Sequence, residues 1–246
     1  MTLRHATLVA FAALWPALGF AAVGKVVALE GTATRTPSGG KPAPLVVGAD
    51  IELKDTLEVS KTGKLKLALN DESVIILGEG AKLEIREAEF AGLERKGFWG
   101  HLGAGKLWTK VKRALGGGKF EVSTEKAVAG VRGTIFRIDA QTMVNAASGR
   151  KVAATIVRVS EGQVAVRPSS KVARSSGKKK PAATPKGPRR EVPPPFQEIS
   201  KDQWETLVAE LQHNRQIAVG VDLWELSEYE QAAKEDAFSK WVDSNQ

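Results

Sequence analysis

Residues Phe120–Phe136 read FEVSTEKAVAGVRGTIF and hold the most distinctive pattern in the 246-residue chain. Apolar and polar residues alternate on both sides of a glycine pair, which is typical of two strands joined by a tight turn. Gly130 and Gly133 bracket Val131 and Arg132, and glycine permits backbone conformations that other residues avoid. We expect strand, turn and strand, with the Arg132 guanidinium either paired with an interior carboxylate or directed toward a ligand.

The same alternation extends outward from this stretch, over residues 22–167. Its clearest run is Lys64–Leu69, whose three leucines fall on one face of a strand. The turn residues Asn70 and Asp71 then lead into the apolar run Ser73–Leu77, which predicts a hairpin or one turn of a solenoid. The sequence therefore predicts an all-β main domain of many short strands, arranged as a sandwich or as a solenoid.

The rest of the chain has a different composition. Residues 168–196 are rich in lysine, proline, serine and glycine and have few large apolar residues, so burial cannot offset their ordering entropy. We expect a disordered or extended linker there. Residues 197–246 are predicted to form a helical tail of two short amphipathic helices, which begin at the capping sequences Ser200–Gln203 and Ser227–Glu230.

The N-terminal 21 residues resemble a secretory signal. Arg4 and His5 precede an apolar run of about fifteen residues, Ala6–Phe20, which ends in small residues. This run is shorter than the roughly 20 residues of a membrane-spanning helix, although retention as an anchor is the alternative. We expect cleavage, no later transmembrane span, and a periplasmic location. The absence of cysteine excludes disulfides and thiolate chemistry.

The net charge of +8 is concentrated in the linker. Between residues 168 and 195 there are eight basic residues against one acidic residue, so the remaining chain is nearly neutral. We therefore expect no nucleic-acid partner, since no extended basic face remains for phosphate binding. The linker is either a solvated spacer or a segment that holds anionic envelope polymers or lipid headgroups by charge.

The residues that could carry chemistry favour structural roles. The segment Gly100–Lys106 has the spacing of a phosphate-binding loop, but leucine follows where Ser or Thr would contact Mg²⁺. Apart from the signal, the only histidines are His101 and His213, which lie on different predicted elements. Carboxylates at Asp50, Asp55 and Asp71 are placed as turn residues. We expect no catalytic residues, no cofactor and no metal, and an enzyme of envelope polysaccharide that uses these aspartates is the rival hypothesis.

The glycine-bearing stretch resembles the signature of the FecR domain. The resemblance rests on Gly130, Val131, Arg132, Gly133, Thr134 and Phe136, with Glu125 in place of the usual proline. The segments Gly24–Gly31, Leu45–Leu57 and Gly63–Leu77 resemble other parts of the family pattern in the same order, so the resemblance covers about residues 24–167. It implies an all-β periplasmic sensing or interaction module without catalytic residues.

The resemblance also implies a regulatory setting. FecR regulators relay transporter occupancy at the outer membrane to a cytoplasmic sigma factor, and they carry an anti-sigma segment and a transmembrane helix before the β domain. Here the domain directly follows the expected signal, so we expect no direct anti-sigma role. The prediction is a non-enzymatic binding, scaffolding or sensing protein that engages an envelope protein or glycan. The alternatives are an accessory subunit of a polysaccharide enzyme and a regulatory partner of a membrane signalling protein.

The helical tail offers a second contact. Its large apolar residues are candidate partner anchors, because buried aromatic and aliphatic side chains dominate interface energetics. The alternative is that the two helices pack on each other or on the sheet. The candidate anchors are Trp204, Leu207 and Leu211 of the first predicted helix and Phe238 and Trp241 of the second.

Overall fold

The computed structural model describes residues 22–112, 117–131, 133–144, 151–169, 215–220, 224–228 and 236–245. The expected signal at residues 1–21 and most of the expected linker lie outside this range. So do Arg132 and the first predicted helix, with Trp204, Leu207 and Leu211.

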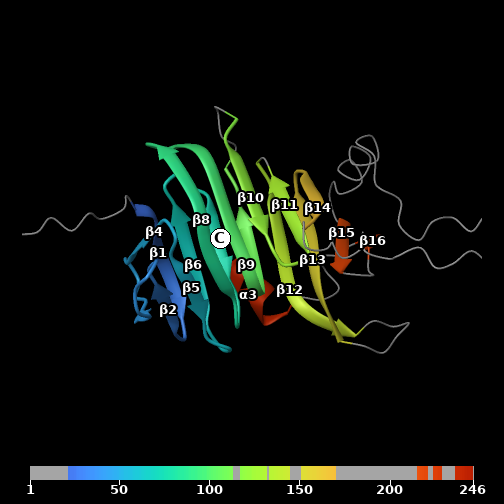
Figure 1. Cartoon of the computed structure of the whole chain (residues 1–246), viewed down its shortest axis with the longest axis horizontal. Coiled ribbons are helices and arrows are strands. Elements are labelled where there is room, and N and C mark those ends of the chain that lie inside the picture. The colour runs from blue at the N-terminus through green and yellow to red at the C-terminus, as the bar shows by residue number, and fades with distance from the viewer. Residues whose placement is uncertain are drawn as a thin grey trace, which may run out of the picture.

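The fold is one curled, mostly antiparallel sheet folded into two layers (Figure 1). Layer A contains β1 (Ala22–Glu30), β4 (Asp50–Glu52), β6 (Lys64–Leu69), β7 (Val74–Leu77), β12 (Ile135–Val144), β13 (Lys151–Glu161), β15 (Arg215–Gly220) and β16 (Trp224–Glu228). Layer B contains β2 (Ala33–Thr36), β3 (Ala43–Pro44), β5 (Thr56–Val59), β8 (Lys82–Ala91), β10 (Lys119–Ser123), β11 (Ala127–Val131) and β14 (Val164–Pro168). The all-β prediction is confirmed, and of its two arrangements the layered one describes this fold.

Strand β9 (Glu94–Lys110) joins the two layers. Its first half pairs with β8 and β10 in layer B, and its last residues pair with β7 and β12 in layer A. Gly105, with φ of +84°, lies near the change of layer, where a Cβ would stand 2.4 Å from the Ala81 Cα. Only glycine combines this backbone conformation with so close an approach.

The core lies between the layers and follows the alternation of the strands. Leu65 and Leu67 of β6 are fully buried, and the chain turns after Leu69 into the antiparallel partner β7. The hairpin that was predicted at this turn is confirmed. Hydrophobic side chains from both layers meet in this single core.

The glycine-bearing signature carries the chain from one layer to the other. Val131 ends β11 in layer B, Gly133 has φ of +64°, and Ile135 begins β12 in layer A. The Thr134 hydroxyl donates a 2.9 Å hydrogen bond to the Gln163 carbonyl, and Phe136 is fully buried in the core. The predicted strand, turn and strand are confirmed, and the turn is a crossing between layers.

The structure of the C-terminal tail contradicts part of the helical prediction. Strand β15 pairs with β13, and β16 pairs with β15, so the prediction of an entirely helical tail is wrong over these residues. Ile217 and Val219 of β15 reach the core with the two-residue period of a strand. The predicted helix start at Ser227 is also wrong, since Ser227 lies in β16.

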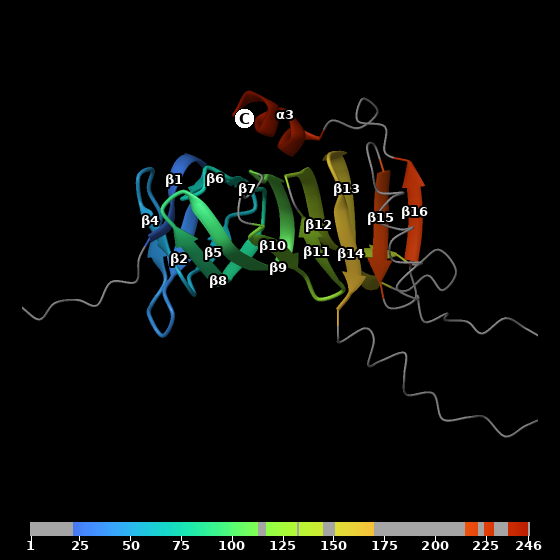
Figure 2. The same ribbon diagram turned by 90° about the horizontal axis from the view of Figure 1, so that it is seen from above.

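One described helix, α3 (Ala237–Ser244), begins after the N-cap residue Asp236, whose carboxylate accepts a hydrogen bond from the Ser239 amide. Figure 2 shows α3 on the outer side of layer A, away from layer B. Among the described residues, no helix has the length and apolarity needed to cross a membrane.

Candidate binding face

The outer face of layer A is occupied by the chain's own helix. Phe238 and Val242 of α3 are buried against Ile76 and Trp108 of the sheet. Gly78 makes room for this contact, because a Cβ there would stand 2.7 Å from the Phe238 ring. The sheet surface around Gly78 is therefore shaped to accept the Phe238 side chain of the helix.

Ionic contacts hold the first turn of α3 in place. Asp236 accepts hydrogen bonds from the Arg137 guanidinium at 2.8 and 3.1 Å and from Lys106 Nζ at 3.0 Å. Partial burial disfavours the ionised carboxylate, but the hydrogen bonds from Arg137, the Ser239 amide and Lys106 outweigh it and hold the pKa of Asp236 well below its ordinary value. The same cluster contributes to raising the pKa of Arg137, against the effect of burial.

Two of the candidate partner anchors contact the chain's own sheet. Phe238 is 1% exposed, and Arg137 Cζ lies 5.1 Å from its ring centre. Trp241 is half-buried, with Lys64 Nζ 6.0 Å from its ring centre. This arrangement corresponds to the alternative in which the tail packs on the sheet.

The outer face of layer B is different, since none of the elements described covers it. Its most exposed aromatic residue is Trp99 of β9, which is 37% exposed. The indole Nε1 donates a 2.9 Å hydrogen bond to the Ser123 hydroxyl, and Arg86 Cζ lies 5.4 Å from the ring centre. Trp99 is thus held in a defined orientation on an open face.

Ser123, which accepts the hydrogen bond from the Trp99 indole, is itself held in place by its neighbours. Its side chain is buried, its hydroxyl donates to the Gly100 carbonyl at 3.2 Å, and it lies 3.1 Å from His101 Nδ1. Because the hydroxyl oxygen is buried and accepts the Trp99 indole N–H, this serine is placed to position its neighbours rather than to attack a substrate.

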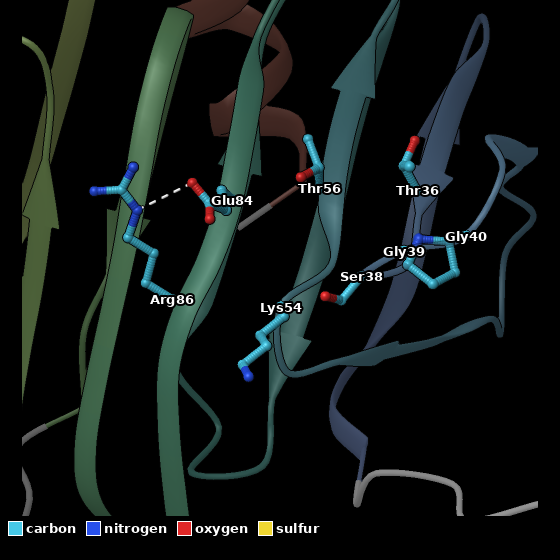
Figure 3. Close-up of a pocket in the computed structure, with 9 residues that line it drawn as sticks. Thr36, Ser38, Gly39, Gly40, Lys54, Thr56, Glu84 and Arg86 are labelled. Carbon is cyan, nitrogen blue, oxygen red and sulfur yellow. Dashed lines mark hydrogen bonds and ion pairs between the residues drawn. The ribbon is translucent and has the colours of Figure 1, made fainter.

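A pocket of about 420 Å³ lies on the β8 side of Trp99 and includes Arg86, which contacts the Trp99 ring. Figure 3 shows its hydroxyl-bearing residues Thr36, Ser38 and Thr56. We call it the hydroxyl pocket. Arg86 belongs to this pocket and pairs with Glu84 at 3.0 Å. Its lining residues are Thr36, Pro37, Ser38, Gly39, Gly40, Lys54, Thr56, Glu84 and Arg86.

A second hollow of about 590 Å³, the glycine groove, lies on the β10 side. It contains part of the family signature. At Gly130 a Cβ would approach no atom closer than 3.9 Å, so the fold itself does not require glycine at this position. The missing side chain deepens the groove instead. Its lining residues are Gly117, Gly118, Lys119, Phe120, Glu121, Gly130, Val131, Gly133, Gln163 and Ala165.

The three aspartates of the rival enzyme hypothesis are engaged in separate structural contacts. Asp55 is buried, accepts a 2.7 Å hydrogen bond from the Glu52 amide and pairs with Arg35 at 2.6 Å. Asp71 accepts from Ser73 Oγ at 2.8 Å and pairs with Arg95, and Asp50 pairs with Lys25 at 2.7 Å. Within the described part of the chain, no group of three or more histidine and carboxylate side chains has the geometry of a metal site.

The segment with phosphate-loop spacing is extended. Gly100–Lys106 lies within β9, and no helix begins there to offer its N-terminal amides to a phosphate.

Sequence reasoning missed the binding face because it depends on strand order. A signal was present, since Phe98 and Trp99 are consecutive in an extended segment and must point to opposite faces. Phe98 is buried and stacks on Phe120 at 4.6 Å, which leaves Trp99 on the outside.

These features define the class of protein, a two-layered β module in which a helix of the chain packs on the outer face of one layer and no described element covers the outer face of the other. Residues 55–165 match the model of the family described as FecR protein, so this part of the chain is a FecR domain. The match begins after β1, β2, β3 and β4, which belong to the same sheet in the structure. A search of curated proteins gave no significant match.

Two solved structures resemble the chain, both crystal structures of a candidate anti-sigma factor from Parabacteroides distasonis. One has 18% identity and a TM-score of 0.44, with 71% of this chain and 60% of that chain covered. The other has 19% identity and a TM-score of 0.44, with 76% and 64% covered. This chain therefore spans less than two thirds of either structure.

The FecR domain supports a signal-sensing or regulatory role. FecR proteins are regulatory proteins and are not known as enzymes.

Proposed function

We propose that this protein is a periplasmic sensing or scaffolding protein that binds an envelope protein or glycan through the outer face of layer B. The observation that carries the proposal is the asymmetry between the two outer faces. In layer A, α3 packs over Ile76 and Trp108 on the outer face, whereas layer B presents Trp99 between two hollows. A sensing module needs an exposed face with defined side-chain geometry, and layer B offers one.

The rest of the chain supports this setting. The signal-like N-terminus and the absence of cysteine are consistent with export to the periplasm. The basic linker would keep the β domain near anionic polymers or lipid headgroups of the envelope.

The proposed function involves no catalysis. The carboxylates at Asp55 and Asp71 are buried and engaged by basic and backbone groups, which suits structural roles. The FecR domain carries no catalytic residues by resemblance, and the binding face is built around an aromatic residue.

The test is crosslinking of the full chain in intact envelopes, followed by purification and identification of what is attached. Wild type is compared with Trp99→Ala and with Leu93→Ala, which removes another exposed hydrophobic side chain from the β8–β9 turn. We expect the Trp99 variant to lose its crosslinked partner and the Leu93 variant to keep it. Retention of every partner by folded Trp99→Ala protein would refute the assignment of this face.

A further inference from the structure

The hydroxyl pocket, Trp99 and the glycine groove form one continuous strip. Arg86 belongs to the hydroxyl pocket and also stacks on Trp99. On the other side, strand pairing places Trp99 next to Glu121, Glu121 next to Gly130, and Gly130 next to Ala165. We call this path, from Thr36 to Ala165 across the outer face of layer B, the cross-strand strip.

The strip is long and runs across the strands. It crosses β2, β5, β8, β9, β10, β11 and β14 in that order. With neighbouring strands about 4.8 Å apart, its length is roughly 29 Å. Because the backbone groups of its inner strands are already paired, a peptide could not bind along this path by adding a strand.

The side chains of the strip suit a ligand rich in hydroxyl groups. Thr36, Ser38 and Thr56 each offer a hydroxyl that donates and accepts, and Gln163 offers an amide. Of the large hydrophobic residues that are exposed on the described part of the chain, only Trp99 lies on the strip. This is too little apolar surface for the core of a protein interface, but one oriented aromatic ring suits a sugar ring.

The charges of the strip are mixed, with positive charge in both hollows and the exposed carboxylate of Glu87 beside Trp99. Arg86 pairs with Glu84 at 3.0 Å, and Arg167 beside the groove pairs with Glu121 at 3.8 Å. Lys54 in the hydroxyl pocket and Lys119 in the glycine groove are both exposed, and neither makes an ion pair with a described residue. A positive charge is therefore available in each hollow, on either side of Trp99.

We propose that the cross-strand strip binds an extended acidic polysaccharide, in which carboxylate-bearing sugars meet Lys54 and Lys119 and a sugar ring packs against Trp99. This inference rests on the proposed function and names its ligand class. Weak contacts distributed along the strip favour a polymer over a single sugar, because each hollow is open to solvent.

The test is calorimetric titration of the full mature chain with an oligogalacturonate hexamer, a carboxylate-bearing probe, and with neutral cellohexaose. We expect binding of the oligogalacturonate and at least severalfold weaker binding of cellohexaose. Trp99→Ala should weaken oligogalacturonate binding roughly tenfold. The double variant Lys54→Gln/Lys119→Gln should weaken it severalfold at low salt, with a smaller effect at high salt.

Two variants separate the strip from other positive charges. Lys178→Gln/Lys179→Gln/Lys180→Gln reduces the charge of the linker, and Lys25→Gln/Lys240→Gln removes two exposed lysines outside the strip. The Lys25→Gln/Lys240→Gln variant should bind oligogalacturonate like wild type. The linker variant should lose less binding than Lys54→Gln/Lys119→Gln, because it removes only attraction by charge outside the strip. Gly130→Gln, whose Cβ fits without a clash, should fold normally and weaken binding by filling the groove.

The proposal is overturned if the neutral probe binds equally well, if only the linker variant loses binding, or if neither saccharide binds. If no saccharide binds but Trp99→Ala still loses its envelope crosslinks, the saccharide assignment fails and the proposed function stands. If the crosslinks also survive in Trp99→Ala, both fail.

Discussion

At the scale of single residues, Arg95 shows how the fold uses a charge inside its core. Its side chain is fully buried, pairs with Asp71, and donates to Ser73 Oγ and to the Lys112 carbonyl at 3.1 Å each. Burial lowers the pKa of Arg95 despite the favourable effect of Asp71. Asp71, a candidate catalytic carboxylate in the rival hypothesis, therefore has a structural partner.

Removing Asp71 should destabilise the fold. Asp71→Ala leaves a buried guanidinium without its counter-ion, and we expect a loss of about 3–5 kcal/mol in the free energy of unfolding, measured by urea denaturation. Asp50→Ala, which breaks the exposed pair with Lys25, should cost less than about 1 kcal/mol. Equal effects of the two substitutions would contradict the structural role of Asp71.

Alanine substitutions at Gly105 and Gly130 should differ in their effect on stability, because the fold requires glycine only at the first position. Gly105→Ala meets the Ala81 backbone at 2.4 Å in a left-handed conformation, and we expect it to cost at least about 1–3 kcal/mol. In Gly130→Ala the nearest atom to the new Cβ lies 3.9 Å away, and the effect on the free energy of unfolding should be within about 0.5 kcal/mol. A large loss at Gly130 would show that the signature glycine serves the fold.

At the scale of elements, α3 depends on a few side chains, since a helix of eight residues is marginal alone. Phe238 supplies the buried contact and Asp236 supplies the ionic one. Substitution of either should release the helix without unfolding the sheet, because the core between the layers does not include α3.

This release can be followed by amide hydrogen exchange. In Phe238→Ala, loss of about 3 kcal/mol of packing should speed exchange within α3 roughly 100-fold and leave β6 and β9 protected. Lys240→Gln, on the exposed side of the helix, is the control. Simultaneous loss of protection in β6 would mean that helix and sheet unfold together.

The docking of α3 should also resist mild acid. The pKa of Asp236 is lower in the folded state than in the unfolded chain, so its contribution to docking is fully present above the ordinary aspartate pKa of 3.8 and is lost only as pH falls toward the folded value. NMR signals of α3 should stay unchanged from neutral pH to about pH 5. In Asp236→Asn, α3 should be more weakly docked across that whole range, and release of wild-type α3 near pH 5 would contradict this account.

At the scale of the whole molecule, β9 makes the two layers interdependent. It pairs with β8 and β10 in one layer and with β7 and β12 in the other, and one core fills the space between. We expect calorimetry to show one unfolding transition for the β domain, with equal calorimetric and van't Hoff enthalpies. Two separate transitions would show that the layers fold independently.

The amino-acid sequence by itself determined the strands and their faces. Leu65, Leu67 and Phe136 are buried where alternation predicted a core face, because a two-residue period is a local property of extended chain. The FecR signature was legible for a similar reason, since its glycines and turn residues act locally. The tail was only partly predicted, because the alternation at Ile217 and Val219 is short. Whether this segment forms a strand depends on its pairing with β13, which lies far away in the sequence.

Tertiary structure alone decided the candidate site. Which layer a strand joins, and which face α3 covers, depend on contacts between residues far apart in the chain, such as Phe238 against Trp108 and Asp236 against Arg137. Trp99, Glu121 and Ala165 form one strip only because β9, β10, β11 and β14 lie side by side. A local pattern orients each side chain toward a face, whereas the pairing of distant strands determines which side chains share that face.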